Sequence, residues 1–400
     1  MTFQLYTCTN DLVSDECKKY TFSHFLFVPL PKIPQCMIVQ ANRIEDFRNI
    51  SARLADVQYC SSDRSVIVNG DSQTVLSAIP DQSVSLILTD PPYHSTKKEN
   101  IVNDKSFKSD EDFLCWVEIY AKEWKRILRP NGSGFMFCSS AMEAKLELML
   151  SKYFNVLSHI VWAKPNEPGY DGWKGKMKKE SLRQWYPHSE RIIFFEPATE
   201  GNLKRSYFGS LLREARSKCG MSTNELTEII GAYGKVNHGG AVSNWEAGRN
   251  VPSREQYEKM CVAFDKHGID MPCYENVIRP FEVNANVEFT DIWMFPSVKQ
   301  YQGKHPAEKP IEMLEHCIRS TTFENDIVLD CFAGSGSTLI AALKTNRLSI
   351  GIEIDEKWCT TIKKRLALVE KIDVCKFEGY TFMKGSGKKR KETAEAPCLF

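Results

Sequence analysis

The segment "DIVLDCFAGSGSTLIAALKTNRLSIGIEID", residues 326–355, decides the fold class of this chain. It consists of an apolar run, a turn that holds Gly334 and Gly336, a run of helix-forming apolar residues, and a second apolar run that stops at Glu353. Continuous apolar runs are typical of strands that are buried on both faces of a parallel sheet. The pattern therefore predicts a strand, a turn, a helix and a second parallel strand, which is the repeating unit of an α/β protein.

Further segments predict the rest of this sheet. "SVIVNGD" (65–71) and "SVSLILTD" (83–90) are strands joined by a short crossover, and "GFMFCSS" (134–140), "NVLSHIVWAK" (155–164) and "ERIIFFEPA" (190–198) are three more. We expect helices at 44–54, from the cap Ser109 to Pro130–Gly132, at 141–154, and from 357 to about 372. Aromatic residues repeat at helical spacing after Ser109 and are expected in the core: Phe113, Trp116, Tyr120 and Trp124.

The composition excludes several classes of protein. The chain has 400 residues, a formal net charge of +1, and 14 cysteines. No CxxC pair is present, which argues against a zinc site, and Cys115, Cys138 and Cys331 lie in apolar runs where we expect reduced core thiols. The apolar stretch from Phe22 to Pro31 is too short to span a bilayer and has no basic leader. We therefore expect a soluble, cytoplasmic protein without a metal or a membrane segment.

Between Phe208 and Phe264 the pattern changes from strands to helices. Two of these helices begin with a capping box, and apolar residues recur at helical spacing in each. The boxes are Ser222 with Glu225 and Ser253 with Gln256; the apolar stripes are Leu212, Ala215 and Cys219, then Leu226, Ile229 and Ile230, then Tyr257, Met260, Cys261 and Phe264. The pattern predicts a small all-α module inserted into the α/β protein.

The glycine turn limits the kind of ligand. Leu339 stands where a dinucleotide fingerprint has its third glycine, and no Gly-Lys-Ser/Thr follows to form a phosphate loop. Glu353 ends the next strand, where a carboxylate can accept both hydroxyls of an adenosine ribose. The pair predicts a nucleoside cofactor without a required pyrophosphate, a description that S-adenosylmethionine fits.

Four motifs resemble those of a known family. "TDPPY" (89–93), "HPAEKP" (305–310), "DCFAGSGST" (330–338) and "GIEID" (351–355) are similar to the motif set of the S-adenosylmethionine-dependent DNA amino-methyltransferases, which modify adenine N6 or cytosine N4. The DPPY motif precedes the cofactor motif, and this circularly permuted order resembles the β group of these enzymes. One departure is Glu308, where this group often has glutamine. The resemblance implies a Rossmann-like methyltransferase sheet.

The resemblance also implies roles for single residues. The cofactor is expected among Asp71, Lys309, Asp330, Phe332, Gly334, Gly336, Thr338 and Glu353, with Lys309 at its methionine end and Asp71 at its adenine. A plain helix cap is the alternative for Asp71. The catalytic residues are Asp90, Pro91, Pro92 and Tyr93. Asp90 and a carbonyl, most simply that of Pro91, would accept the N–H groups of a flipped base, while Tyr93 offers it a ring face.

Two segments are candidates for contact with DNA. The first mixes basic and aromatic residues, and its basic members are Lys174, Lys176, Lys178, Lys179 and Arg183; the alternative is a solvated loop. The second, 221–260, resembles the helix-turn-helix of Cro and phage-repressor domains, in which the third helix enters the major groove. That resemblance nominates Asn237, His238, Ser243 and Asn244 for base edges and Arg249 for phosphate. This module would read either the methylation site or a separate operator.

The expected organisation has five parts. These are an N-terminal extension (1–60), a catalytic half (61–205), a helix-turn-helix insert (206–275), a cofactor half (276–375) and a basic tail (376–400). The expected function is sequence-specific methylation of double-stranded DNA, with adenine N6 favoured by Asp90. Cytosine N4 and a regulator with a non-catalytic methyltransferase fold are the alternatives. A prokaryotic or phage origin, a restriction endonuclease partner, and a monomer or homodimer are compatible with the resemblance.

Overall fold

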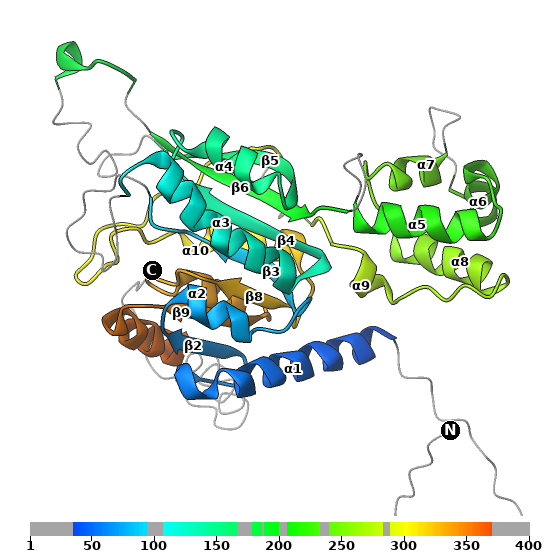
Figure 1. The fold of residues 1–400 in the computed structure, drawn as a ribbon, viewed down its shortest axis with the longest axis horizontal. Coiled ribbons are helices and arrows are strands. Elements are labelled where there is room, and N and C mark those ends of the chain that lie inside the picture. The colour runs from blue at the N-terminus through cyan, green and yellow to red at the C-terminus, as the bar shows by residue number, and fades with distance from the viewer. Residues whose placement is uncertain are drawn as a thin grey trace, which may run out of the picture. The chain divides into compact units, whose positions relative to one another are not determined.

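The computed structural model describes residues 35–93, 107–165, 178–185, 188–199, 206–232, 240–282 and 289–369. In this part of the chain nine strands form one sheet in the order β1-β2-β9-β8-β3-β4-β6-β5-β7 (Figure 1). Their bounds are β1 Gln58–Ser61, β2 Ser65–Asn69, β3 Val84–Thr89, β4 Leu128–Cys138, β5 Phe154–Ala163, β6 Ser189–Pro197, β7 Ile292–Trp293, β8 Ile327–Asp330 and β9 Leu348–Glu353. Strands β2, β9, β8, β3 and β4 are parallel, so the α/β class is confirmed.

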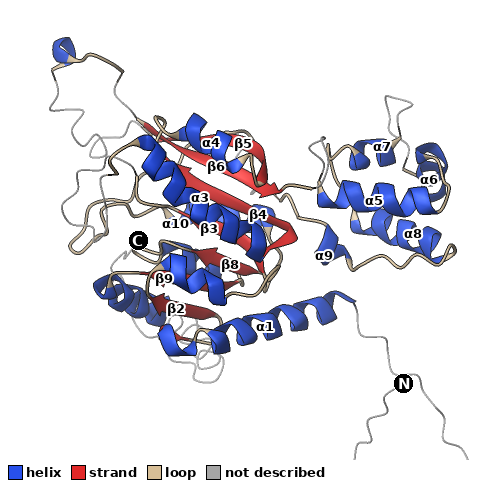
Figure 2. Cartoon of the chain, in the orientation of Figure 1, coloured by secondary structure: helices blue, strands red, loops and turns tan. Residues whose placement is uncertain are grey.

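Helices cover both faces of the sheet (Figure 2). On one face, α1 (Gln35–Arg53), α2 (Ser72–Val75), α3 (Asp110–Ile127) and α4 (Glu143–Leu150) share a core with Val84 and Ile87 of β3. On the other face, α10 (Ile311–Thr321) and α11 (Ser337–Lys344) share a core with Leu86 and Leu88. The successive residues Leu86, Ile87 and Leu88 thus face the two cores alternately, which is why all three are apolar.

The order in which the chain adds strands reverses between β8 and β3: it proceeds toward one edge of the sheet from β8 and toward the other edge from β3. These two strands are neighbours, and their register pairs Leu86 with Val328 and Ile87 with Leu329. From β8 the chain passes through α11 to β9 on one side, whereas from β3 it passes through α3 to β4 on the other side. A crevice forms at such a switch point, outside the carboxyl ends of the strands, and it is where α/β proteins bind ligands.

Several predicted boundaries were wrong. The segment Pro130–Gly132 does not end α3: the helix stops at Ile127, and these residues lie inside β4. The register of β4 against β3 shifts between Val84 and Leu86, so an irregularity accommodates the proline outside the regular hydrogen-bond ladder. Helix α1 begins before the expected residue 44, and α4 ends before the expected residue 154, which instead starts β5. Within the described residues the last helix covers 356–369. Its expected end near 372 lies outside them.

Two side chains expected in the core are exposed. Cys115 lies on the outer side of α3, because the buried residues of that helix, such as Phe113 and Val117, occupy the opposite side. Ile229 is 54% exposed, since Leu226 and Ile230 supply the inner stripe of its helix. Cys138 and Cys331 are buried, as expected, and the cysteines of the described residues for which a state is given are free thiols. Among the described helices, none has the length and apolar character needed to cross a membrane.

The helical segment has a core of its own. It contains α5 (Tyr207–Lys218), α6 (Thr223–Ile230), α7 (Ala241–Glu246) and α8 (Arg254–Asp265), followed by the short α9 (Tyr274–Val277). Trp245 and Phe264 are buried in this core together with residues of α5 and α6. Both predicted capping boxes are present, at Ser222 and at Ser253. The buried Glu246 joins α7 to α5, since Arg216 donates to it from Nε at 2.5 Å.

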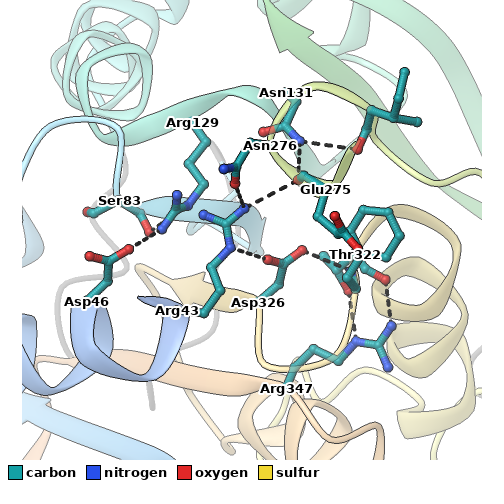
Figure 3. Close-up of polar contacts among 12 residues, drawn as sticks. Arg43, Asp46, Ser83, Arg129, Asn131, Glu275, Asn276, Thr322, Asp326 and Arg347 are labelled. Carbon is teal, nitrogen blue, oxygen red and sulfur yellow. Dashed lines mark hydrogen bonds and ion pairs between the residues drawn. The ribbon is translucent and has the colours of Figure 1, made fainter. Parts of the chain in front are cut away.

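A buried polar cluster connects α1, α9 and the amino ends of β4 and β8 (Figure 3). Arg43 forms an ion pair from Nε to Asp326 Oδ1 at 2.9 Å and donates from Nη2 to Asn276 Oδ1 at 3.1 Å. Asn131 donates to the carbonyl of Glu275 at 3.0 Å. Burial raises the pKa of Asp326, and the neighbouring Arg43 opposes that rise because it favours the charged carboxylate. Arg43 therefore joins three segments that are distant in the sequence, and Asn131 connects β4 to the same cluster.

We expect Arg43→Ala to lower the free energy of unfolding by about 3 kcal/mol, because it removes the ion-pair partner of a buried carboxylate. Urea denaturation followed by circular dichroism measures this change. The matched control is Arg48→Ala on the same helix, whose side chain is 73% exposed. The control should change stability by no more than about 0.5 kcal/mol. Equal effects of the two substitutions would show that the cluster does not stabilise the fold.

Candidate active site

A cavity of about 500 Å³ lies at the carboxyl ends of β2, β9, β8 and β3. Its lining includes predicted catalytic and predicted cofactor residues together: Asp71, Asp90, Pro91, Pro92, Tyr93, Lys309, Asp330, Phe332, Gly334, Thr338 and Glu353. Gly336 is the exception, since it is absent from this lining. The fold thus brings "TDPPY" and "DCFAGSGST", which are far apart in the sequence, to one crevice at the switch point.

Glu353 holds the glycine turn from the end of β9. Its Oε2 accepts a hydrogen bond from the Gly334 amide at 2.7 Å, and its Oε1 accepts one from the Asp355 amide at 2.9 Å. Burial raises the pKa of Glu353 to about 7, although the two amides oppose the rise. Each carboxylate oxygen can accept more than one hydrogen bond, so the group can also accept from a ligand in the cavity.

Asp330 ends β8 and connects the two motifs. Its Oδ1 accepts from Thr89 Oγ1 at 3.1 Å and from the Phe332 amide at 3.1 Å. Thr89 precedes residues 90–93, the DPPY corner, so the Asp330 carboxylate fixes the end of β3 as well as the start of the glycine turn. Burial raises the pKa of Asp330 to about 6, while hydrogen bonds from Thr338, the Phe332 amide and Thr89 oppose the rise.

The two glycines of the turn have different roles. Both have positive φ, +50° at Gly334 and +79° at Gly336, a backbone conformation that residues with a Cβ rarely adopt. A Cβ on Gly334 would lie 3.2 Å from the ring of His305, which is in edge contact with Trp358. A Cβ on Gly336 would lie 2.8 Å from Ile362 Cγ1. Gly334 therefore keeps the cavity open, whereas Gly336 allows the last helix to pack behind the turn.

Asp71 and three aromatic residues form another part of the lining. The side chain of Asp71 caps α2 by accepting from the Gln73 amide at 2.9 Å, so the capping alternative is observed, while the residue also lines the cavity. Phe332 lies against Trp116 and Tyr120, with ring centroids 5.5 Å and 5.2 Å apart. Trp116 and Tyr120 line the cavity as well, a role that the prediction of a purely structural core missed.

The DPPY corner, predicted to be catalytic, follows β3. Asp90 Oδ2 accepts from Lys309 Nζ at 2.5 Å, and its buried Oδ1 has no hydrogen-bond partner among the described residues. Burial raises the pKa of Asp90, and the neighbouring Lys309 acts against that rise. The prolines at 91 and 92 fix φ and have no N–H to offer Oδ1. A buried acceptor without a donor costs free energy unless a ligand supplies one.

Sequence reasoning missed two charged residues in this cavity. Glu190 accepts from Tyr93 Oη at 3.0 Å and from Lys164 Nζ at 2.6 Å. Lys309 lies 3.3 Å from Glu190 Oε2 as well as beside Asp90. No motif marks Glu190 or Lys164; only the topology does, because β6 is antiparallel and begins at the edge where the parallel strands end. Lys309, expected at the methionine end of the cofactor, lies beside the DPPY corner.

Among the residues that the structure describes, no predicted DNA-contact side chain lines the cavity. Lys178 and Arg183 are exposed, as is Trp185 at 96%, and Lys179 lies in the short helix Lys179–Ser181. Lys174, Lys176, Asn237 and His238, together with the side chain of Lys179, lie outside the described residues. Ser243 and Asn244 belong to α7, and the exposed Arg249 follows it and donates to Asn244 Oδ1 at 3.1 Å.

The fold and cavity define an α/β enzyme whose nucleoside-type pocket adjoins a carboxylate corner. Residues 84–364 match the DNA methylase family N6_N4_Mtase, and the chain belongs to this family. It is 25% identical over 305 residues to DNA adenine methyltransferase YhdJ of Escherichia coli (strain K12), covering 75% of this chain and 82% of that protein. It is 26% identical over 309 residues to type II methyltransferase M.BglII of Bacillus subtilis, covering 73% of this chain and 66% of that protein. The solved PvuII DNA methyltransferase (cytosine-N4-specific) has a TM-score of 0.45 at 16% identity, covering 75% of this chain and 85% of that one.

The chain is therefore a DNA methyltransferase, and its cofactor is S-adenosylmethionine. The residues present fit that molecule. The cavity volume of about 500 Å³ suits a nucleoside-sized ligand, its wall combines aromatic rings with the Glu353 carboxylate, and a Cβ at Gly334 would narrow it. When bound, S-adenosylmethionine supplies an electrophilic methyl group on a sulfonium sulfur.

We expect Gly336→Ala to destabilise the protein more than Gly220→Ala. Both glycines have positive φ, +79° and +69°, so alanine at either costs about 1–2 kcal/mol in backbone conformation. Only Gly336 has a neighbour, Ile362, in the space of the new Cβ, whereas nothing lies within 4 Å of that space at Gly220. Thermal unfolding and binding of S-adenosylhomocysteine would measure the difference. Equal losses of stability, with unchanged ligand affinity, would contradict the packing role of Gly336.

Proposed function

We propose that this enzyme methylates the N6 amine of adenine in double-stranded DNA at a specific sequence. The observation that supports the proposal most directly is the unpaired, buried Oδ1 of Asp90, a residue that lines the same cavity as the glycine turn. An exocyclic amine has the N–H groups that such an acceptor requires. Adenine is favoured over cytosine because the family's cytosine enzymes more often have serine in the position of Asp90.

In this proposal the corner supplies two fixed acceptors. Asp90 accepts one N–H of the amine, and the carbonyl of Pro91 accepts the other. Because the prolines restrict φ, the carbonyl is oriented before the base arrives. Positive charge develops on the nitrogen as it is methylated, and a charged acceptor stabilises that charge more than a neutral one does.

Tyr93 is proposed to provide a face for the flipped base. Removing a base from the duplex costs a few kcal/mol, and stacking on an aromatic ring offsets part of this cost. The hydrogen bond from Tyr93 Oη to Glu190 at 3.0 Å limits rotation of the ring. Burial raises the pKa of Tyr93 far above its ordinary value, so the phenol stays neutral and remains a donor to Glu190.

On the cofactor side, we assign Glu353 to the ribose hydroxyls and Phe332 to the adenine surface. Because Gly334 has no side chain, the cofactor can approach the backbone closely there. Asp330 and Thr338 hold the turn in place through their mutual hydrogen bond. Asp71 caps α2 and lines the same cavity, so its proposed contact with the adenine is compatible with its observed cap. Lys309 is at the junction of the two sides, since it contacts Asp90 and lines the cavity.

The helical module is proposed to read the DNA sequence. Support comes from its separate core, its two capping boxes, and the exposure of Ser243 and Arg249 at α7, the third of its helices. It occupies the position between the DPPY and cofactor motifs, where permuted enzymes of the β group carry their recognition region. The basic segment with Lys178 and Arg183 would add phosphate contacts. The five-part division and the permuted order belong to this proposal.

The alternatives remain cytosine-N4 methylation and a regulatory role in which the module binds an operator. A restriction endonuclease partner is a further part of the proposal, in keeping with relatives that are named type II methyltransferases. The proposal also includes a location in the reducing cytoplasm, which agrees with the free thiols found among the described cysteines.

Single-molecule sequencing of DNA from cells that express the chain tests the proposed base and its sequence specificity. We expect methylated adenine at one sequence motif. Methyl groups on cytosine N4 would show that cytosine, the alternative base, is the one modified. DNA that is bound but carries no new methylation would favour the regulator.

The same assay tests the module. We expect Asn244→Ala to relax or change the methylated motif while adenine remains the modified base, because loss of a base contact costs about 1–3 kcal/mol of discrimination. The control is Lys218→Ala on α5, whose side chain is 63% exposed and pairs with Glu214. The control should leave the motif unchanged. An unaltered motif in both variants would argue that the module binds elsewhere.

We also expect a pH dependence of cofactor binding that originates at Glu353. Its pKa of about 7 means that the carboxylate form, which accepts ribose hydroxyls, becomes populated as the pH rises through neutrality. Affinity for S-adenosylhomocysteine should therefore increase about tenfold between about pH 6 and about pH 8. Calorimetric titration measures this, and Glu353→Gln should bind more weakly with a flat profile over that range. A flat profile in the native protein would contradict the ribose contact.

A further inference from the structure

Lys309 contacts the carboxylate that the reaction needs. Its Nζ lies 2.5 Å from Asp90 Oδ2 and 3.3 Å from Glu190 Oε2, and its side chain is only 8% exposed. The ammonium also lies over the rings of Tyr93 and Phe137, at 5.5 Å and 5.0 Å from their centroids. A cation enclosed in this way cannot exchange its carboxylate partners for water without a large cost.

This arrangement creates a conflict at Asp90. A lysine bound to one carboxylate alone would draw negative charge from it and make it a weaker acceptor for the amine of the base. Removing the lysine instead would leave the buried Asp90 without a counter-charge. Glu190 resolves the conflict, because it offers the same ammonium a second carboxylate from a different strand, β6.

We propose that Glu190 is a positioning residue for the methyl transfer: by sharing Lys309 it weakens the hold of that cation on Asp90 and leaves Asp90 a stronger acceptor for the amine of the base. This inference rests on the proposed role of Asp90. Glu190 acts through Lys309 and does not itself contact the reacting atoms. Lys164 and Tyr93 hold Glu190 in place, at 2.6 Å from Oε1 and 3.0 Å from Oε2.

The electrostatics of the cavity agree with this division of roles. Burial would raise the pKa of Glu190, but Lys309 and Lys164 hold it at about 2, so Glu190 is a permanent anion. Burial would lower the pKa of Lys309, but Asp90 and Glu190 together raise it. The charged or titratable groups that act on Asp90 come from every neighbouring element: Lys309, Glu190, Tyr93, Cys138 and Asp330. Glu190 is the one that counters Lys309 directly by contact.

Glu190→Gln tests the inference, since it removes the charge and keeps the shape. The full attraction of Lys309 then falls on Asp90, which lowers the pKa of Asp90 and its strength as an acceptor. We expect kcat for methylation of plasmid DNA to fall by about tenfold or more, while KM for S-adenosylmethionine changes by less than about threefold. The acid limb of the pH–rate profile should move to lower pH, because Asp90 then stays ionised further into acid.

Glu190→Asp and Glu196→Gln are the comparison variants. Glu190→Asp keeps the charge and should restore most of kcat and the native acid limb. Glu196 lies on the same strand and forms an ion pair with Arg279 at 3.3 Å, outside the cavity lining. Glu196→Gln thus controls for loss of a strand β6 ion pair, and its acid limb should match that of the native enzyme.

A titration of Asp90 separates the inference from catalysis. Carbon-13 labelling of aspartate carboxyl groups, with the Asp90 signal assigned by its loss in Asp90→Asn, reports the pKa in the absence of DNA. A lower Asp90 pKa in Glu190→Gln than in the native protein supports the inference. An unchanged pKa and an unchanged acid limb would overturn it, even if kcat fell. Methylation of cytosine N4 would contradict the proposed base but leave this comparison valid, since both bases carry an exocyclic amine.

Discussion

The active site depends on the pairing of β3 with β8. This pairing places two residues side by side although they lie 241 positions apart, and Thr89 donates to Asp330 across the gap at 3.1 Å. Because the two strands are parallel, their carboxyl ends, and therefore the DPPY corner and the glycine turn, reach the same edge of the sheet. Because the chain then departs in opposite directions, a crevice opens between them. A shift in register by one residue would turn Thr89 away from Asp330 and separate the corner from the pocket.

The cavity contains two groups of carboxylates that differ in their partners. On the cofactor side, Asp330 and Glu353 have pKa values raised by burial to about 6 and about 7, and backbone amides and hydroxyls hold them. On the base side, Asp90 and Glu190 share Lys309, and Lys164 adds a second cation. In the proposed reaction positive charge develops on a nitrogen, and the sharing of Lys309 between Asp90 and Glu190 would leave Asp90 a strong acceptor for the N–H of that nitrogen.

Much of the sheet and part of the site could be predicted from the sequence, because both depend on local patterns. Apolar runs that end in aspartate or glutamate marked the strand ends at Asp90, Asp330 and Glu353, and the capping boxes marked two helices. Glu190 and Trp116 could not be found in this way. Their functional positions follow from an antiparallel strand and from the packing of α3, which no local motif encodes. The proline at 130 was misread because a strand irregularity admits it.

We propose that one cavity has two separable sides, a corner for the base and a turn for the cofactor. Asp90→Ala tests it most directly when methylation of DNA and binding of S-adenosylhomocysteine are measured on the same preparation. We expect methylation to be abolished while the affinity for S-adenosylhomocysteine stays within about threefold of the native value. A variant that still methylates DNA, or one that loses cofactor binding together with activity, would contradict it.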